Sequence, residues 1–229
     1  MSTQVHEMFS QIAPRYDLAN DVMSFGTHRG WRKKAVKLSM AKAGDAVLDC
    51  ATGTGDLALD FKRVVGATGS VIGTDFNAEM LQRAPAKASQ AGLEVKFEIA
   101  DAMHLPYADA TFDIASISFG IRNVDDPSKC LRELARVVKP GGRVVVLEFG
   151  QPTGVFGAMY RVHARFVMPR IGGFLTGNRK AYEYLPQTAA AFPCGERFTA
   201  MMKDTGAYTE QAATPLMAGL AYVYVGVRK

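Results

Sequence analysis

The sequence predicts an α/β fold with a mostly parallel, doubly wound sheet, and three observations support this prediction. An apolar run ending at Leu48 leads through a glycine-rich turn, residues 53–55, into the helix-like segment 57–61. Strand-like and helix-like segments then alternate as far as Phe149, which is typical of a parallel sheet. Three of the strand-like segments end in an aspartate, at the edge where open α/β sheets bind ligands.

Seven strands are expected along the chain. Helix-like residues 1–44, interrupted by Pro14 and Gly26, precede the first strand. A helix at 131–138 should stop at the turn 140–142, and a helix near 198–203 should lead to the last two strands. The final strand alternates as an edge hairpin would. The expected strands span residues 46–48, 70–75, 95–101, 112–119, 143–149, 208–214 and 219–227.

The 229 residues, 48% of them hydrophobic, suit a single domain with a large core. We expect a helical lid at 1–44 and a cofactor-binding core at 45–149. A helical insertion at 150–195 should face the substrate and a membrane, and a C-terminal helix and hairpin should occupy 196–229.

The cysteine pattern and the N-terminus both suggest the cytoplasm. Cys50, Cys130 and Cys194 show neither a CxxC motif nor a metal-ligand spacing, so we expect free thiols and no metal site. Neither a secretory signal pattern nor a run long enough to span a membrane is present. A cytoplasmic protein is therefore expected, with peripheral contact at the inner face of the membrane left open.

The net charge of +5 comes from one segment, because residues 151–182 contain five basic residues and no acidic residue. This basic, apolar and aromatic stretch is a candidate for transient contact with an anionic membrane surface. The alternative is a helix pair that packs its apolar side on the core and leaves its arginines in solvent. The five basic residues are Arg161, Arg165, Arg170, Arg179 and Lys180.

The acids around the glycine-rich turn indicate which ligand it holds. The turn, with Asp75 downstream, also fits the dinucleotide fingerprint, in which a diphosphate sits at the helix N-terminus. Here Asp49 precedes the turn and Asp56 follows it, and two carboxylates would repel a diphosphate. S-adenosyl-L-methionine carries an ammonium and a sulfonium instead of phosphates, so the sequence favours this methyl donor.

Two further acids follow strands where such a donor needs them. Asp75 is placed to accept hydrogen bonds from both ribose hydroxyls, and Asp101 to accept one from an adenine amino group. The backbone N–H of Ala102 is then available to the adenine ring. The alternative is that these acids only cap the elements that follow them.

Together these motifs resemble class I methyltransferases dependent on S-adenosyl-L-methionine, which have a Rossmann-like fold. The segments outside this core resemble the ubiquinone/menaquinone-biosynthesis C-methyltransferase family, over essentially the whole chain. The segments that carry this second resemblance are the pattern over residues 9–31, SFGIRN at 118–123, LEF at 147–149 and YEYL at 182–185.

The resemblance implies methylation of a ring carbon in a reduced, polyprenylated quinone precursor. The YEYLP sequence at 182–186 is more similar to the menaquinone members, which implies conversion of demethylmenaquinol to menaquinol. The alternative is a 2-polyprenyl-6-methoxy-1,4-benzoquinol in ubiquinone synthesis. Tyr224 stands where relatives often carry histidine, so no role of that histidine transfers. The implied donor site consists of Thr54, Asp75, Asp101, Ala102 and Ser118, with Asp49, Gly53 and Gly55 in the surrounding loop.

Carbon methylation requires a quinol hydroxyl to lose its proton, directly or through a water. We expect Arg122 and Asn123, just past the fourth strand, to act in this step. Arg122 stays protonated, so it would stabilise the phenolate or orient a water. The alternative is that Arg122 pairs with Asp125 or Asp126 to hold the loop.

Other side chains are expected around the acceptor. Phe166 and Met168 are candidates to hold the isoprenoid tail. His28 and His163 are expected to be structural, because no acidic partner for either is identifiable in the sequence. The candidates to contact the quinol ring are Tyr16, Tyr182 and Tyr184.

Three other functions remain as alternatives. An isoelectric point near 9.1 and the basic cluster at 28–34 suggest an RNA methyltransferase, but no RNA-binding module is recognisable, so no nucleic-acid partner is expected. A non-catalytic subunit that keeps the donor pocket is the second alternative, and a nicotinamide-dependent reductase is the third. A homodimer is left open.

Overall fold

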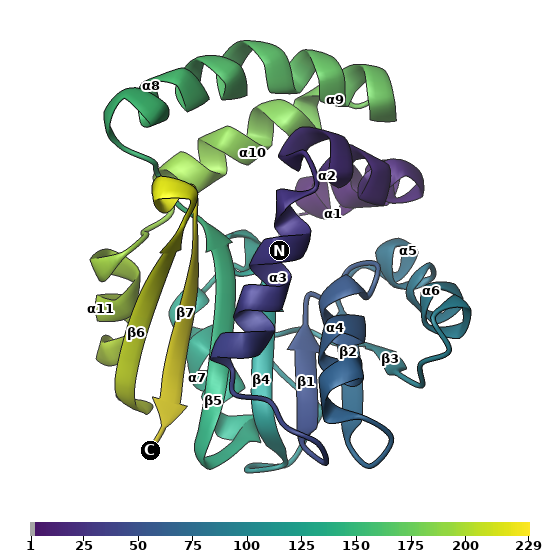
Figure 1. Cartoon of the computed structure of the whole chain (residues 1–229), viewed down its shortest axis with the longest axis vertical. Coiled ribbons are helices and arrows are strands. Elements are labelled where there is room, and N and C mark those ends of the chain that lie inside the picture. Colours follow the sequence, from purple (N-terminus) through teal and green to yellow (C-terminus); the bar gives the residue numbers. More distant parts are fainter. Residues whose placement is uncertain (1–2) are drawn as a thin grey trace.

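A seven-stranded sheet in the order β3-β2-β1-β4-β5-β7-β6 forms the centre of the computed structural model, which describes residues 3–229 (Figure 1). The first five strands are mutually parallel, while β7 runs antiparallel to both β5 and β6. The strands are β1 (Ala46–Cys50), β2 (Ser70–Asp75), β3 (Lys96–Ile99), β4 (Phe112–Ser118), β5 (Val138–Phe149), β6 (Tyr208–Leu216) and β7 (Ala221–Arg228).

Helices cover both faces of the sheet and its carboxyl edge. The N-terminal helices are α1 (Thr3–Ile12), α2 (Tyr16–Ser24) and α3 (Thr27–Leu38). The helices between strands are α4 (Asp56–Val65), α5 (Ala78–Leu81), α6 (Ala84–Gln90) and α7 (Pro127–Val137). Between β5 and β6 lie α8 (Gly154–Val162), α9 (Met168–Thr176), α10 (Arg179–Ala191) and α11 (Glu196–Asp204), and a π-helical turn at His163–Val167 joins α8 to α9.

The sheet has a separate hydrophobic core on each face, because successive strand residues point to opposite sides. On β1, Val47 packs with side chains of α3 and α4, including Trp31 and Phe61. Its neighbour Leu48 belongs to the opposite core, with side chains of α7 and α11 such as Leu131. Figure 1 shows α3 and α4 in front of the sheet and α7 behind it.

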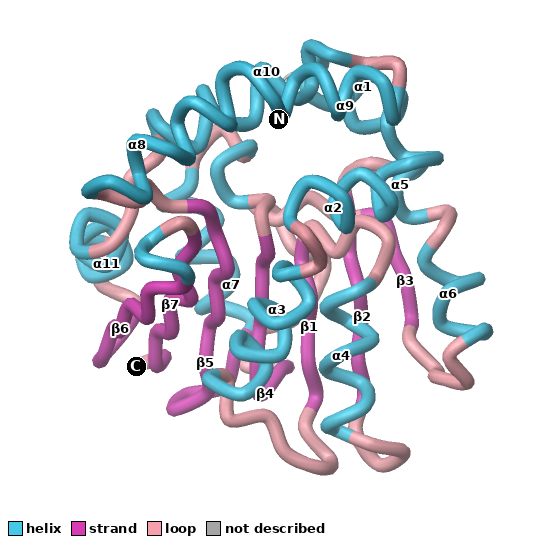
Figure 2. The backbone as a smooth tube through the Cα atoms, turned by 45° about the horizontal axis from the view of Figure 1, so that its top comes forward, coloured by secondary structure: helices cyan, strands magenta, loops and turns pink. Residues whose placement is uncertain are grey.

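A helical lid lies over the carboxyl edge of the parallel strands. It consists of α1, α2 and α8–α10, which lie together above that edge in Figures 1 and 2. Ile12, Ala19 and Tyr182 form a small buried cluster that packs α1, α2 and α10 against one another. The lid therefore has a hydrophobic core of its own. No helix among residues 3–229 is long and apolar enough to cross a bilayer.

The predicted order of strands and helices is confirmed, but several boundaries were wrong. The strand expected at 95–101 ends at Ile99, and Asp101 lies beyond it in an isolated bridge with His104. β5 begins at Val138 because Val138 pairs with Phe112, so the expected turn at 140–142 lies inside that strand, where the register shifts. The last strand was predicted to lie at an edge of the sheet, but β7 lies between β5 and β6, and β6 forms that edge.

The position of β4 within the sheet predicts a difference in sensitivity between two isoleucines. Ile117 on β4 is fully buried, whereas Ile99 on the edge strand β3 is 63% exposed. Ile117→Ala should lower the free energy of unfolding by roughly 2–5 kcal/mol because it leaves a cavity. Ile99→Ala is the matched control and should cost about 0.5 kcal/mol or less. Urea unfolding of both variants measures the difference, and equal losses would contradict this assignment of the core.

Candidate functional site

The loops that follow β1, β2 and β4 meet where the strand order reverses between β1 and β4. Two cavities open beside these loops. The smaller one, called the donor cavity here, has a volume of about 310 Å³, and the larger one, called the lid cavity, has a volume of about 500 Å³. They share part of their walls, including Tyr16, Gly53 and Ser118. A molecule in one cavity therefore lies next to a molecule in the other.

The glycine-rich turn closes one wall of both cavities. Gly53 and Gly55 have φ angles of +57° and +88°, in the left-handed region that favours glycine. A Cβ at Gly55 would lie 3.0 Å from the Cβ of Ala84, and a Cβ at Gly53 would lie 3.3 Å from Cε of Met80. The two glycines thus allow close packing of the turn against α5 and α6, and they keep the backbone accessible at the cavity wall.

Asp75 has the geometry expected for a diol-binding carboxylate. Its two oxygens each accept a hydrogen bond from a backbone N–H, of Gly53 and of Asn77, both at 2.8 Å. Each carboxylate oxygen keeps a second lone pair, so Asp75 can accept from two further hydroxyls in the donor cavity that it lines. Burial raises the pKa of Asp75, while the two backbone hydrogen bonds lower it.

Asp101 and Ala102 lie on the same donor cavity wall as Asp75, as the sequence predicted. One oxygen of Asp101 accepts a hydrogen bond from the backbone N–H of Met103 at 2.9 Å. The other oxygen lies 3.5 Å from Nδ1 of His104. The backbone after β3 therefore holds this carboxylate in place.

Asp49 lines neither cavity, so the expectation that it stands beside the ligand was wrong. Its side chain is fully buried beneath the turn and accepts hydrogen bonds from the hydroxyls of Thr52 and Ser116, both at 2.7 Å. Burial raises the pKa of Asp49 to about 7, although these hydrogen bonds lower it. Asp49 is placed to hold the turn from below.

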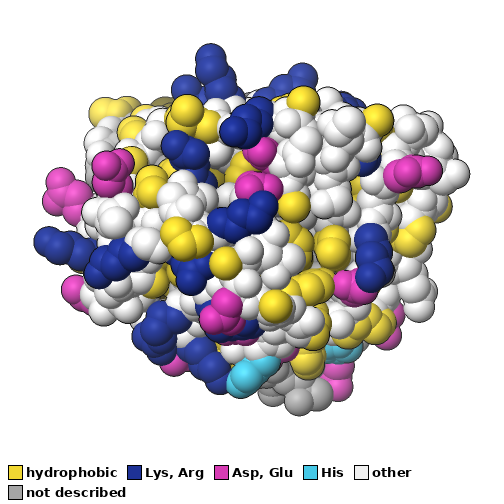
Figure 3. Space-filling view, turned by 90° about the horizontal axis from the view of Figure 1, so that it is seen from below, with side chains coloured by type: hydrophobic (Ala, Val, Ile, Leu, Met, Phe, Trp, Pro, Cys, Tyr) yellow, Lys and Arg dark blue, Asp and Glu magenta, His cyan; other side chains and the backbone are white. Residues whose placement is uncertain are grey.

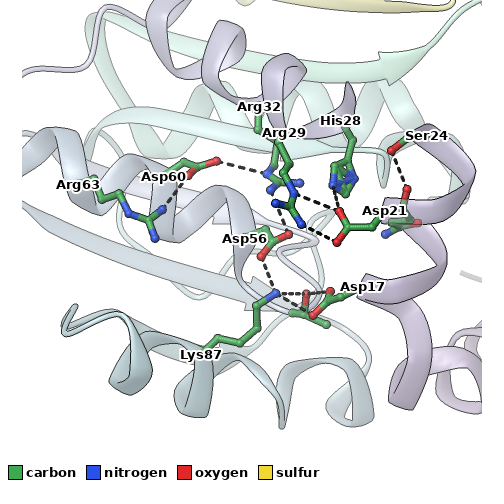
Figure 4. Close-up of polar contacts among 12 residues, drawn as sticks. Asp17, Asp21, Ser24, His28, Arg29, Arg32, Asp56, Asp60, Arg63 and Lys87 are labelled. Atoms are coloured by element: carbon green, nitrogen blue, oxygen red, sulfur yellow. Dashed lines mark hydrogen bonds and ion pairs between the residues drawn. The ribbon is translucent and has the colours of Figure 1, made fainter. Parts of the chain in front are cut away.

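Thr54 and Asp56 belong to a polar network that ties the turn to the lid and to α6. Figure 4 labels its members Asp17, Asp56 and Lys87. The Thr54 hydroxyl donates to Asp17 of α2 at 2.6 Å. Nζ of Lys87 lies within hydrogen-bond distance of Asp17, Thr54 and Asp56, at 2.9, 3.0 and 2.5 Å. We call these four residues the lid clasp. Thr54 lines the lid cavity next to Gly53, which lines both cavities, and the donor-binding role expected for Thr54 stays a prediction.

The network continues along α3 (Figure 4). Its contacts differ from what the sequence suggested for Asp56 and His28. Arg32 lies 3.1 Å from Asp56 and lowers the pKa of that carboxyl together with Lys87, so Asp56 does not repel an anion as strongly as the sequence suggested. Nε2 of His28 lies 3.0 Å from Asp21, an acidic partner that sequence spacing did not reveal because the turn at Gly26 folds α3 back on α2. Burial lowers the pKa of His28.

Arg122 forms a buried ion pair with Glu148 of β5 at 2.8 Å, and the two side chains are 4% and 1% exposed. Arg122 also donates to the carbonyl of Phe119 and lies over the ring of Phe149, 5.3 Å from its centre. Asp126, one of the partners considered from sequence, instead caps the N-terminus of α7. Sequence reasoning missed Glu148, whose only signal was the LEF segment at 147–149.

The buried pair leaves one N–H donor of Arg122 without a hydrogen-bond partner in the described part of the chain, although the residue lines the lid cavity. Among residues 3–229, Nε of Arg122 is buried without a hydrogen-bond partner. Burial raises the pKa of Glu148, while the charge of Arg122 lowers it. An unpaired buried N–H costs roughly 1–3 kcal/mol, and the contacts of the guanidinium with Glu148 and with the Phe119 carbonyl hold Arg122 in place despite this cost.

Of the other residues that were predicted to contact the methyl acceptor, only some line the cavities. Tyr16 lies at the wall shared by both cavities, and burial raises its pKa. Tyr184 donates its hydroxyl to Oδ1 of Asn123 at 3.1 Å, which links α10 to the turn after β4. Met168 lines the lid cavity, whereas Phe166 is 49% exposed and lines neither cavity, so its contact with the isoprenoid tail stays a prediction.

The family model of the ubiE/COQ5 methyltransferase family matches residues 1–228. The chain is 57% identical over 226 residues to the ubiquinone/menaquinone biosynthesis C-methyltransferase UbiE of Bdellovibrio bacteriovorus, covering 98% of this chain and 96% of that protein. It is 50% identical over 223 residues to the demethylmenaquinone methyltransferase of Thermus thermophilus, covering 96% and 100%.

Solved structures with the same fold are more distant in sequence. A SAM-dependent methyltransferase from Thermotoga maritima is 20% identical, with a TM-score of 0.69 over 97% of this chain and 99% of that chain. One from Aquifex aeolicus is also 20% identical, with a TM-score of 0.65 over 86% and 89% of the two chains. These neighbours confirm the predicted Rossmann-like methyltransferase fold.

The raised pKa of Asp49 predicts how stability depends on pH. The unfolded carboxyl has a pKa of 3.8, so between this value and about 7 the folded chain binds more protons than the unfolded chain. The free energy of unfolding should therefore fall as the pH rises through this window, by up to about 1.4 kcal/mol per pH unit from this group. Asp49→Asn removes this contribution.

Urea unfolding of the wild-type chain and of Asp49→Asn at pH 5 and pH 7.5 measures this effect. The difference in unfolding free energy between the two chains should shift in favour of the variant as the pH rises. Parallel pH dependences would show that Asp49 ionises in the folded chain as readily as in the unfolded one.

Proposed function

The chain belongs to the ubiE/COQ5 methyltransferase family, and from this premise we propose that it methylates a ring carbon of a reduced polyprenylated quinone precursor. The methyl donor is S-adenosyl-L-methionine, and the acceptor we favour is demethylmenaquinol, the substrate class named in the Thermus relative. The observation that carries the proposal is the buried Arg122–Glu148 pair, whose arginine lines a largely apolar cavity beside the donor cavity.

The residues of the donor cavity fit the donor. S-adenosyl-L-methionine supplies a methyl group on a sulfonium when it is bound. Asp75 keeps acceptor positions for both ribose hydroxyls, and Asp101 with the backbone of Ala102 suits the adenine amino group and ring. The open backbone at Gly53 lets the ligand approach the turn, and Ser118 lies where the donor cavity meets the lid cavity.

The lid cavity suits an aromatic acceptor with an apolar tail. Its wall includes Trp31, Phe119 and Phe149, whose ring centres lie 4.4–6.5 Å from one another. Aromatic walls of this kind favour a flat ring such as that of a quinol. A volume of about 500 Å³ is ample for a naphthoquinol ring.

Activation of the ring carbon requires a negative charge on the neighbouring oxygen. Arg122 remains protonated, and Glu148 fixes its position, so the charge that develops on the quinol oxygen is stabilised without movement of the guanidinium. Asn123 accepts from Tyr184 through Oδ1 and lines the donor cavity, so the role we propose for it is to position Tyr184, which lines the lid cavity. An oxidised quinone has no hydroxyl to ionise and is therefore not the substrate.

We also propose transient contact with a membrane surface, because a polyprenylated quinol is itself a lipid. The five basic residues of 151–182 are all exposed, and that segment contains no acid. Its basic charge complements an anionic surface. The homodimer considered from the sequence stays a prediction.

Methyl transfer to defined quinols tests the proposal. Purified protein is incubated with S-adenosyl-L-methionine and a short-chain prenylated naphthoquinol, and the product mass is measured. A prenylated benzoquinol and the oxidised naphthoquinone are run in parallel. Product from the naphthoquinol alone supports demethylmenaquinol, and product from both quinols means one enzyme for both rings. No product from either, with the donor shown to bind, contradicts the proposal and directs attention to RNA acceptors.

Arg122→Ala should lower turnover by about 10²–10³-fold, since removal of one preorganised donor of this kind typically has an effect of that size. Donor affinity should stay within about threefold of the wild-type value, because Arg122 lines the lid cavity and not the donor cavity. Steady-state kinetics and donor titration by calorimetry provide the two measurements.

Arg132→Ala is the matched control, because Arg132 is 51% exposed on α7 and should be replaceable without loss of turnover. Equal losses of turnover and donor affinity in Arg122→Ala would instead assign Arg122 to the folding of the loop.

A further inference from the structure

Four exposed apolar side chains line the lid cavity and show where it reaches the surface. They come from three separate segments: the turn between α2 and α3, helix α8, and the turn between β6 and β7. We call this set the cavity rim. Its members are Phe25, Phe156, Met159 and Met217, with exposed fractions of 83%, 41%, 67% and 46%.

At two rim positions a backbone conformation that is costly for residues other than glycine coincides with an apolar side chain exposed to water. Phe25 has φ +49° and Met217 has φ +43°, so both lie in the left-handed region. A residue other than glycine costs roughly 1–2 kcal/mol there. Each position therefore carries two separate costs, one from the backbone conformation and one from the exposure of apolar surface to water. A nonpolar environment outside the protein would remove the second penalty.

The lid cavity is too small to enclose a long polyprenyl tail. About 500 Å³ accommodates a drug-sized molecule, which corresponds to a quinol ring with the first part of a tail. A long polyprenyl tail must leave the cavity, and it would otherwise cross into water. Exposed apolar side chains at the opening suit a tail that passes directly into a hydrocarbon phase.

The charges beside the rim suit a particular surface. Arg161 and Arg165 are exposed just after Met159, in a segment with no acidic residue from 151 to 182. By contrast, the opposite face of the molecule, seen in Figure 3, mixes Lys and Arg with Asp and Glu.

We propose that the cavity rim inserts into an anionic lipid bilayer, so that the acceptor ring enters the lid cavity while its tail stays in the membrane. This inference rests on the proposed function and deepens it, because it assigns the membrane contact to the mouth of the cavity. This proposal places the outer face of α9, where Phe174 is 87% exposed, in water, because Phe174 does not line the lid cavity. Phe25 and Phe174 are thus a matched pair.

Tryptophan reporters at the two positions test the insertion. Phe25→Trp and Phe174→Trp are prepared as separate full-length variants, and the native Trp31, which is 7% exposed, gives the same background in both. Each variant is mixed with vesicles of phosphatidylcholine and phosphatidylglycerol that contain brominated acyl chains, without donor or acceptor. We expect bromine quenching of the Phe25→Trp fluorescence and none beyond background for Phe174→Trp.

The other outcomes overturn the proposal. Quenching of Phe174→Trp alone would assign docking to the outer face of α9. Absence of quenching in both variants would show that lipid does not cover the rim, and would leave a protein partner or a soluble acceptor. Because neither donor nor acceptor is present, a failure of methyl transfer in the enzymatic assay does not affect this result.

Charge reversal tests the anionic part of the proposal. Arg161→Glu combined with Arg165→Glu should weaken binding to phosphatidylglycerol vesicles by about tenfold or more, since a basic residue near such a surface contributes about 1 kcal/mol. Arg132→Glu on α7 is the control and should bind as the wild type does. Equal weakening in the control, or equal binding of the wild type to pure phosphatidylcholine, would show that headgroup charge at the rim does not guide docking.

Discussion

The reversal of strand order between β1 and β4 is the constraint on which the site depends. Parallel strands on the two sides of this point bring their carboxyl ends to one edge, and the loops after them diverge to leave an open crevice. The turn 53–55, Asp75 and Ser118 come from three different strands and meet only because of this arrangement. The lid then converts the open edge into two adjoining cavities, of which one suits a nucleoside and the other an aromatic ring.

Three carboxylates near this edge, of which Asp49 and Glu148 are fully buried and Asp75 is half-buried, have different partners, and their different roles follow from this. Asp49 accepts from two hydroxyls beneath the turn, and burial raises its pKa to about 7. Asp75 accepts from two backbone N–H groups and keeps lone pairs for a ligand. Glu148 is compensated by a full positive charge at 2.8 Å, which makes it a support for Arg122. A buried carboxylate thus acts according to its partners, because an unpartnered charge is too costly to bury.

The lid is attached to the donor loop by polar contacts as well as by its own apolar core. The lid clasp joins α2 to the turn through Asp17 and Thr54, with Lys87 between them (Figure 4). Tyr16 precedes Asp17 in the chain and lies at the wall shared by the two cavities. The position of a residue beside the acceptor is therefore linked to the conformation of the turn beside the donor.

Sequence periodicity and glycine placement determined the order of the strands and helices, the donor-side acids and the position of Arg122 after β4. These features depend on short-range patterns, namely alternation within a strand, the conformational freedom of glycine, and an acid at the end of a strand. The resemblance to known methyltransferases added the reaction. The sequence did not show which side chains are buried, so Asp49 was expected beside the ligand although it lies beneath the turn.

Only the tertiary structure decided which charges meet. Glu148 lies 26 residues from Arg122 in the chain, and Lys87 lies 70 residues from Asp17, so no local spacing marks either pair. The same holds for the rim, where Phe25 and Met217 come together at one cavity from opposite ends of the sequence. Local patterns select the elements because they act within a few residues, whereas ion pairs and cavity walls exist only after distant elements have packed.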